Sequence, residues 1–186
     1  MAWVNTSPLV KTYTLEEFWE LPEPPDHSKL ELIAGVLYMT PLPGYKHNNA
    51  VSRLIRLFSA YLINTGDKGR LQVPRAAIWT SPNTYLEPDL FYMSAETESK
   101  LDPKYPTTTD LVVEVISPGS AIYDRNTKAD TYAALGVKEL WLVDEDGQSI
   151  EIRELEGSRR TFVDNETVTS VVLSDLSFPL RTVFED

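Results

Sequence analysis

Three carboxylates in this 186-residue chain stand where a strand would otherwise be apolar. Residues two apart in a strand share a face, and on this spacing Glu31, Asp89 and Glu114 each share a face with large apolar residues. An ionised carboxylate that is buried without a partner costs several kcal/mol, a large fraction of the roughly 5 to 15 kcal/mol that keeps a domain folded. We therefore expect a positive charge beside them, either a lysine or a bound divalent cation.

Lys128 is the lysine that the spacing favours. It lies four residues after Asp124, so the two side chains share one side of a helix, and Tyr132 continues that side by another turn. A short loop over 117–120 joins this helix to the strand of Glu114, and such a connection can fold Lys128 back toward the end of that strand. A cation is the second candidate, and a site built from oxygen ligands alone favours Mg²⁺ or Mn²⁺ over zinc.

The elements that must position these residues alternate between strands and helices. A capping box at Thr14 and Glu17 predicts a short helix that ends before Pro22. Hydrophobic periodicity predicts helices over 46–63 and 124–135, a loop over 94–109, and strands over 29–40 (with a break near Ala34), 72–79, 85–93, 110–117, 138–144, 148–154, 161–163 and 168–173. Strands outnumber helices and the helices fall between strands, which indicates an α/β or α+β fold with a mixed sheet.

The helix over 46–63 has two different faces. Its apolar residues repeat at helical spacing, and His47 lies on the same face as they do. The opposite side carries a small basic stripe of Lys46, Arg53 and Arg56, which we interpret as a solvated helix face rather than a phosphate contact.

The length and composition of the chain exclude several kinds of site and partner. The length predicts one domain, residues 1–186. Cysteine is absent, which excludes disulfides and cysteine-based metal sites and fits a reducing cytoplasm. The 28 acids exceed the 17 bases and give a net charge of −11, which opposes non-specific attraction to a phosphate backbone. A nucleic-acid role therefore needs a local basic patch or a bound cation. No stretch of the sequence is long and apolar enough to predict a membrane span.

The candidate residues also belong to a longer pattern. It comprises Pro88-Asp89, Glu114 to Pro118, Asp124, Lys128, Tyr132 and Gly136, together with Glu31-Leu32-Ile33-Ala34-Gly35, His47 and the strand that follows Gly136. Over about residues 14–176 this pattern resembles a large bacterial family of uncharacterised endonucleases, a domain of unknown function of the Uma-two type, with the restriction-endonuclease-like fold. The resemblance implies a mixed sheet flanked by helices, with extra antiparallel strands at the C-terminal end.

The resemblance also implies a chemistry. In the nuclease pattern Pro-Asp followed by Asp/Glu-x-Lys, the lysine stands two residues after the second acid, and here that place is Ile116. Similar family members supply the amine from the following helix, which points to Lys128. The resemblance then implies that Asp89, Glu114 and the Val115 carbonyl hold Mg²⁺ or Mn²⁺, while Lys128 orients the water that attacks DNA.

Supporting roles are expected for the remaining residues. Glu31 would lie behind the metal or hold a second one, and His47 could hydrogen-bond a site carboxylate. Asp124 fits the N-cap of its helix better than a metal ligand, because an aspartate in front of a helix accepts backbone N–H bonds. Tyr132 fits a packing role.

The proposed catalytic residues have structural alternatives as well. Glu114 and Lys128 could form a purely structural ion pair. Asp89, which follows a proline, could be a turn residue that begins a strand, and His47 could be an ordinary core histidine.

Two functions remain open on the sequence alone. The first is a metal-dependent DNA endonuclease, which the two acids and the lysine indicate. The second is a nuclease-fold module without turnover that binds or assembles as a homodimer, with hairpin strands between 148 and 173 pairing across the dimer. The net charge of −11 favours this second reading.

Overall fold

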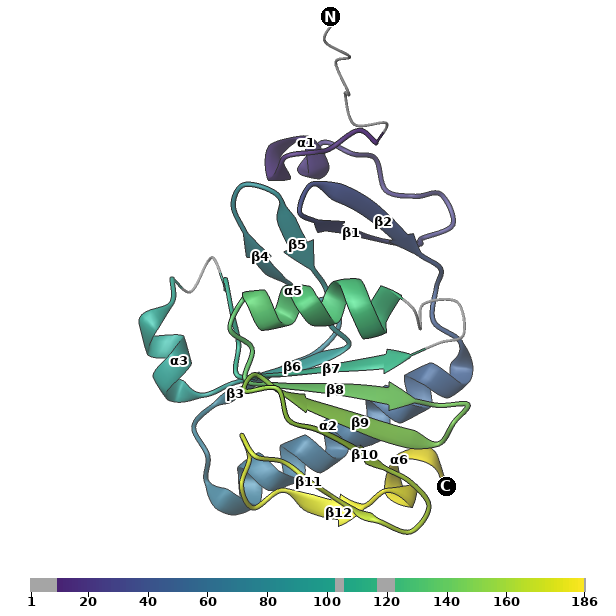
Figure 1. The fold of residues 1–186 in the computed structure, drawn as a ribbon, viewed down its shortest axis with the longest axis vertical. Coiled ribbons are helices and arrows are strands. Elements are labelled where there is room, and N and C mark those ends of the chain that lie inside the picture. The colour runs from purple at the N-terminus through teal and green to yellow at the C-terminus, as the bar shows by residue number, and fades with distance from the viewer. Residues whose placement is uncertain (1–9, 103–105, 117–122, 186) are drawn as a thin grey trace, which may run out of the picture.

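A mixed six-stranded sheet forms the centre of the structure, a computed structural model that describes residues 10–102, 106–116 and 123–185 (Figure 1). The sheet order is β10-β9-β8-β7-β6-β3. Its strands are β3 (Arg70–Gln72), β6 (Leu90–Met93), β7 (Leu111–Ile116), β8 (Glu139–Asp144), β9 (Ser149–Glu154) and β10 (Arg159–Phe162). β7 and β8 pair in parallel and all other neighbours pair antiparallel, so the mixed sheet expected from the sequence is present. The loop expected over 117–120 lies outside the described residues.

Two smaller sheets accompany the central one. The four-stranded sheet has the order β2-β1-β5-β4 and contains β1 (Lys29–Ile33), β2 (Val36–Thr40), β4 (Ile78–Thr80) and β5 (Thr84–Leu86). The break expected near Ala34 is the turn between β1 and β2, where Ala34 and Gly35 both have positive φ. The third sheet pairs β11 (Thr167–Thr169) with β12 (Ser177–Pro179) in antiparallel fashion, which confirms the extra C-terminal strands.

Helices cover both faces of the central sheet (Figure 1). α2 (Tyr45–Thr65) packs on one face together with the C-terminal segment, which ends in α6 (Arg181–Phe184). The π-helical turn η1 (Asp124–Lys128) continues into α5 (Ala129–Ala134), and this helix lies between the other face and the four-stranded sheet. α1 (Leu15–Trp19) begins at the predicted capping box, in which Thr14 and Glu17 exchange hydrogen bonds. Within the described ranges no helix combines the length and apolar character that crossing a membrane requires.

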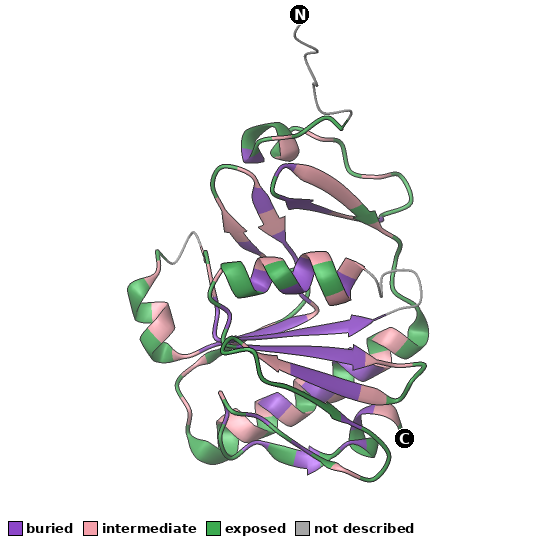
Figure 2. Ribbon diagram, in the orientation of Figure 1, coloured by how far each residue is buried: buried purple, intermediate pink, exposed green. Residues whose placement is uncertain are grey.

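β7 separates two apolar cores, and the alternation of its side chains decides which of its residues face α2 and which face α5. All six of its residues are buried, as expected for a central strand, and Figure 2 shows β7 buried along its length. Leu111, Val113 and Val115 pack toward α2, whereas Val112 and Ile116 pack toward α5. Glu114 therefore belongs to the α5 side, because it alternates with the residues that face α2.

Two of the expected strands are wrong, because each is divided between two sheets. The strand predicted over 72–79 is β3 in the central sheet and β4 in the small sheet, with Pro74 between them. The strand predicted over 85–93 is likewise β5 and β6, separated by Glu87, Pro88 and Asp89. A proline has no N–H to donate to a strand ladder, so the chain leaves one sheet at each proline and joins the other. Asp89 consequently precedes β6 instead of standing within a strand.

The remaining differences concern short elements. The segment predicted as a loop over 94–109 contains α3 (Ala95–Lys100), whose N-cap Ser94 accepts the Thr97 N–H. The strand predicted over 168–173 ends at Thr169, because the Val171 and Val172 N–H groups donate to the buried Glu139 side chain. The predicted helix over 124–135 is present and ends before Gly136, although its first turn is π-helical.

Candidate active site

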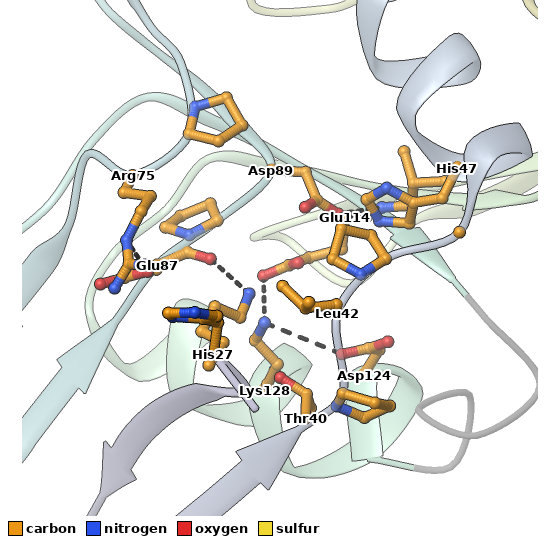
Figure 3. A pocket seen from close by; sticks show the side chains of 17 residues that line it. His27, Thr40, Leu42, His47, Arg75, Glu87, Asp89, Glu114, Asp124 and Lys128 are labelled. Atoms are coloured by element: carbon orange, nitrogen blue, oxygen red, sulfur yellow. Dashed lines mark hydrogen bonds and ion pairs between the residues drawn. The ribbon is translucent and has the colours of Figure 1, made fainter. Parts of the chain in front are cut away.

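One pocket gathers the sequence-predicted residues at the end of β7 (Figure 3). Its volume is about 300 Å³, at the lower end of the range for ligand pockets. Several separate segments form its walls: β1, the loop after β2, the start of α2, the loop before β4, the segment before β6, the end of β7 and the turn η1. Asp89, Glu114, Val115, Asp124 and Lys128 all line it.

Lys128 is the centre of a buried charge cluster. Its Nζ lies 2.6 Å from Glu114 Oε1, 3.2 Å from Glu31 Oε1 and 3.8 Å from Asp124 Oδ1. Burial opposes the charged form of the amine, but the three carboxylates outweigh burial and raise the pKa of Lys128 well above its usual value. The amine is therefore an ammonium ion at neutral pH. The positive charge expected beside the carboxylates is present, and Lys128 supplies it.

Glu114 faces this ammonium from the neighbouring sheet. Its Oε1 also accepts a 2.5 Å hydrogen bond from the Tyr132 hydroxyl, and the surroundings on this side of β7 are apolar. Burial raises the pKa of Glu114 to about 7, because the attraction of Lys128 offsets only part of the desolvation. Glu114 thus changes its protonation near neutral pH. Tyr132 does more than pack, since its hydroxyl orients this carboxylate.

Asp89 is held by two donors from different elements. Its Oδ2 accepts the Val115 N–H at 2.8 Å and lies 3.1 Å from His47 Nε2 on α2. Burial favours the neutral acid, but the hydrogen bonds and the charge of His47 outweigh burial and lower the pKa of Asp89. For His47, burial lowers the pKa, while the bond to Asp89 and its charge dominate and raise it. His47 therefore hydrogen-bonds a site carboxylate, and the Asp89 turn is tied to the end of β7.

Glu31 lies behind Lys128 rather than in the pocket wall. It is fully buried, and its Oε1 accepts the Glu87 N–H at 2.9 Å beside Lys128. Its Oε2 is 3.5 Å from the Tyr123 hydroxyl. Because both oxygens already have partners, this geometry favours a role in fixing the ammonium over the alternative of holding a second metal.

The expectation that Asp124 caps its helix is wrong. η1 begins at Asp124, and the preceding Tyr123 already has helical dihedral angles of φ −66° and ψ −49°. Asp124 is therefore inside the helix, and its buried side chain lines the pocket on the same side as Lys128. The two residues begin and end a π-helical turn, a rare element that often occurs at functional sites.

Sequence reasoning missed several residues of the pocket. His27, Lys29, Arg75 and Glu87 also line it. Lys29 had a signal, since it stands two residues before Glu31 on the same strand and so shares its face. Arg75 had none, because the turn that brings it to the pocket follows from the division of the 72–79 segment between two sheets.

The oxygen donors of the pocket suit a small hard cation. Mg²⁺ is commonly bound through one or two carboxylates, with water and substrate phosphate completing its shell. In the described ranges no hydrogen bond reaches Asp89 Oδ1 or Glu114 Oε2, so each carboxylate keeps one oxygen for a ligand. The same ranges contain no group of three or more His, Asp or Glu placed to enclose a metal ion by themselves. The donor set therefore fits an ion that shares its shell with water and substrate.

Comparison with known proteins identifies the family. Among curated proteins no match to this chain is found. A solved structure, titled as a putative nuclease belonging to DUF820 from Anabaena variabilis, aligns with a TM-score of 0.77 over 92% of this chain and 97% of that chain. The identity is 18%, so this likeness shows the fold, which is restriction-endonuclease-like. A family model described as "Uma2: Putative restriction endonuclease" matches residues 15–181. Because that match spans most of the sequence, the chain belongs to the Uma2 family of putative restriction endonucleases.

Proposed function

We propose that this protein is a divalent-metal-dependent endonuclease that hydrolyses phosphodiester bonds of DNA. The observation that carries the proposal is the convergence of Asp89, Glu114 and the Lys128 ammonium on one pocket from three separate elements. The family description is consistent with a nuclease. We further propose that residues 1–186 form one domain, with a core at about 14–176, and that the enzyme acts in the cytoplasm.

Asp89, Glu114 and the Val115 carbonyl would hold Mg²⁺ or Mn²⁺ in the proposed enzyme. When bound, such a cation polarises the phosphate and lowers the pKa of a water molecule beside it. His47 and the Val115 N–H fix Asp89 at one side of the pocket, and Tyr132 fixes Glu114 at the other. These bonds prepare the two carboxylates before any ligand arrives, which limits the reorganisation required during reaction.

Lys128 would act as a hydrogen-bond donor and not as a base. Its pKa is raised, so the amine has no free lone pair to remove a proton at neutral pH. Its N–H groups can orient the attacking water and stabilise the negative charge that develops on the phosphate oxygens. The expected products carry 5′-phosphate and 3′-hydroxyl ends.

The charge of the pocket supports a requirement for metal. Its lining contains four carboxylates, three permanently charged bases and two histidines, so the two signs nearly balance. A phosphodiester is itself an anion, so this lining alone gives it little net attraction. A divalent cation adds positive charge and makes the pocket attractive. This explains how a chain of net charge −11 could act on nucleic acid.

Cleavage of plasmid DNA in Mn²⁺ or Mg²⁺ tests the proposal. We expect the wild-type protein to nick or linearise the plasmid and Asp89→Ala to lower the rate by about 10³-fold, the scale of losing one electrostatic catalytic group. Asp130→Ala is the matched control, because it removes an exposed aspartate on α5 outside the pocket. Absence of cleavage by the wild type, or equal cleavage by Asp89→Ala, would refute the proposal.

Thermal unfolding tests metal binding without reference to activity. At ten times its dissociation constant a ligand stabilises the folded state by about 1.4 kcal/mol. For a chain of this size that corresponds to about 3 to 6 °C in Tm. We expect Mg²⁺ to raise the Tm of the wild type and of Asp130→Ala, and not that of Asp89→Ala. A shift that is equal in all three proteins would place the ion elsewhere.

The alternative is a module without turnover that self-associates as a homodimer. β10 is one of the two edge strands of the central sheet and so could pair with a second copy. However, β10 carries Arg159 and Arg160, and charged side chains on an edge strand oppose such pairing. Size-exclusion chromatography separates the two proposals, because a monomer that cuts DNA would exclude this alternative.

A further inference from the structure

We propose that Lys29 and Arg75 form a phosphate-binding subsite on one side of the pocket, which holds a phosphodiester of the nucleic-acid strand. This inference rests on the proposed function, since it names how the substrate of that site is held. Figure 3 draws Arg75 and Glu87 on one side of the pocket and Asp124 on the other. Arg75 lies on the side away from Asp124, and Lys29 is linked to it through Glu87, which both bases contact.

Lys29 is a second lysine in the pocket, and its surroundings differ from those of Lys128. Its Nζ donates to the Glu87 backbone carbonyl at 2.8 Å and lies 3.7 Å from Glu31 Oε1. The Lys29 side chain is 27% exposed, whereas that of Lys128 is 2% exposed. An ammonium has three N–H donors, and the Glu87 carbonyl takes one of them. Lys29 therefore keeps donor capacity on the side that is open to the pocket.

The ion pair with Glu31 does not by itself explain why a lysine stands at position 29. Glu31 Oε1 already has Lys128 at 3.2 Å and the Glu87 N–H at 2.9 Å, both closer than Lys29. A partly exposed ion pair at 3.7 Å contributes little to stability. The charge of Lys29 also lowers the pKa of Asp89 and opposes the rise in the pKa of Glu114, but among the described residues neither carboxylate is in ion-pair contact with this amine. A ligand anion would give it a close partner.

Arg75 extends the same wall to the rim of the pocket. Its side chain is 71% exposed, and its Nε lies 3.7 Å from Glu87 Oε2. Glu87 contacts both bases, because its backbone oxygen accepts from Lys29 and its carboxylate lies beside Arg75. A guanidinium presents several donors in a planar fork that suits phosphate oxygens. Lys29 inside and Arg75 at the rim therefore place two cations along one wall, as a strand with successive phosphates requires.

Equilibrium binding of a fluorescein-labelled single-stranded 12-mer tests the subsite. The assay is fluorescence anisotropy in Ca²⁺, which replaces Mg²⁺ to suppress turnover. We expect Lys29→Gln to weaken binding about ten-fold, the value of one hydrogen bond to a charged group. The slope of log K against log salt should fall by about 0.7, as for one lost phosphate contact on a single strand. Lys29→Arg should restore most of the affinity.

Lys68→Gln is the matched control, because it removes the same charge from an exposed loop between α2 and β3, outside the pocket. We expect its affinity and salt slope to equal those of the wild type. Arg75→Gln provides a second test at an exposed position where unfolding is not expected, and it should lower the salt slope as Lys29→Gln does. Circular-dichroism melting establishes that each variant is folded.

The outcomes separate this inference from the proposed nuclease function. If Lys29→Gln is folded and binds like the wild type, the subsite is refuted, even where cleavage depends on Asp89. If Lys29→Gln does not fold, an unchanged salt slope for Arg75→Gln refutes it. Failure of the wild type to bind the 12-mer also overturns it. Lys29-dependent binding without any cleavage would support the subsite and refute the nuclease.

Discussion

Two buried glutamates on neighbouring parallel strands have opposite surroundings. Glu114 on β7 is 2% exposed and Glu139 on β8 is fully buried, yet they belong to opposite faces of the central sheet. Glu139 accepts four hydrogen bonds from neutral donors: Trp141 Nε1 at 2.6 Å, Ser170 Oγ at 2.9 Å, Val171 N at 2.9 Å and Val172 N at 2.7 Å. Glu114 instead has an ammonium and a phenol as partners and lines a pocket.

The difference shows what distinguishes a functional carboxylate from a structural one. Burial alone does not, since both glutamates are buried. Glu139 is enclosed by donors that hold the C-terminal segment against the sheet, so its partners cannot leave without local unfolding. Glu114 lines the pocket, and the described residues bond only its Oε1, so its Oε2 is left for a ligand. The partners of a buried acid, and its access to a cavity, therefore indicate its role.

The comparison between Glu114 and Glu139 predicts that the largest difference between their variants is in the rate of DNA cleavage. Glu114→Gln should lower the cleavage rate by about 10³-fold, because an amide binds Mg²⁺ or Mn²⁺ far more weakly than a carboxylate does. Glu139→Gln should leave the rate per folded molecule unchanged. Single-turnover cleavage of plasmid DNA, normalised to the folded fraction, measures both. Equal losses in the two variants would contradict the distinction.

The second expected effect is on stability, and here Glu139→Gln should have the larger effect of the two variants. Glu139→Gln replaces an acceptor oxygen by an NH₂ group that faces existing donors, so at least one donor loses its partner at a cost of about 2 to 4 kcal/mol. Glu114→Gln should change the free energy of unfolding by less, within about 1 kcal/mol at pH 7, because it also removes a carboxylate that is costly to bury. Lys128 does not become unpaired, since it keeps the carboxylates of Glu31 and Asp124 as partners. Urea denaturation followed by tryptophan fluorescence provides the comparison. A larger loss for Glu114→Gln would indicate a structural ion pair with Lys128.

The third effect is a pH dependence of stability that belongs to Glu114. Burial raises its pKa from 4.5 in the unfolded chain to about 7 in the folded protein. The folded state thus binds the proton more tightly, so the stabilisation is present below pH 4.5 and is lost as pH rises through about 7. The wild type should lose up to about 1.4 kcal/mol per pH unit relative to Glu114→Gln within this window. Urea titrations of both proteins at several pH values test this, because titrating groups far from Glu114 cancel in the difference. A difference that does not change with pH would show that folding does not shift the pKa of Glu114.

Much of the local structure could be predicted from the sequence. The capping box at Thr14 fixed the start of α1, and the apolar run of β7 indicated a strand covered on both faces. The charge argument required a cation beside Glu114, and the spacing from Asp124 pointed to Lys128. The convergence of these residues is as expected, while their catalytic roles remain predictions.

Other features could not be predicted, because they depend on contacts between distant segments. Pro74 and Pro88 mark the places where the chain changes sheets, and nothing local says which sheet each following strand joins. Arg75 reaches the pocket only through that change. The position of Asp124 inside the helix could not be predicted either, because it depends on the conformation of the residue before it.

Within the strands that were placed correctly, the sequence by itself determined which residues share a face, because the alternation of side chains follows from the chain geometry alone. It therefore determined that Glu31 and Glu114 would be buried among apolar residues and would require positive charge. Only the tertiary structure decided which charges meet that requirement and which carboxylate opens to a cavity. The reason is that the pairing of elements across the sheet sets the distances between charges, and the Coulomb energy depends on those distances and on burial. Glu139 and Glu114 are both buried glutamates on neighbouring strands, and their partners and their access to the pocket make them different.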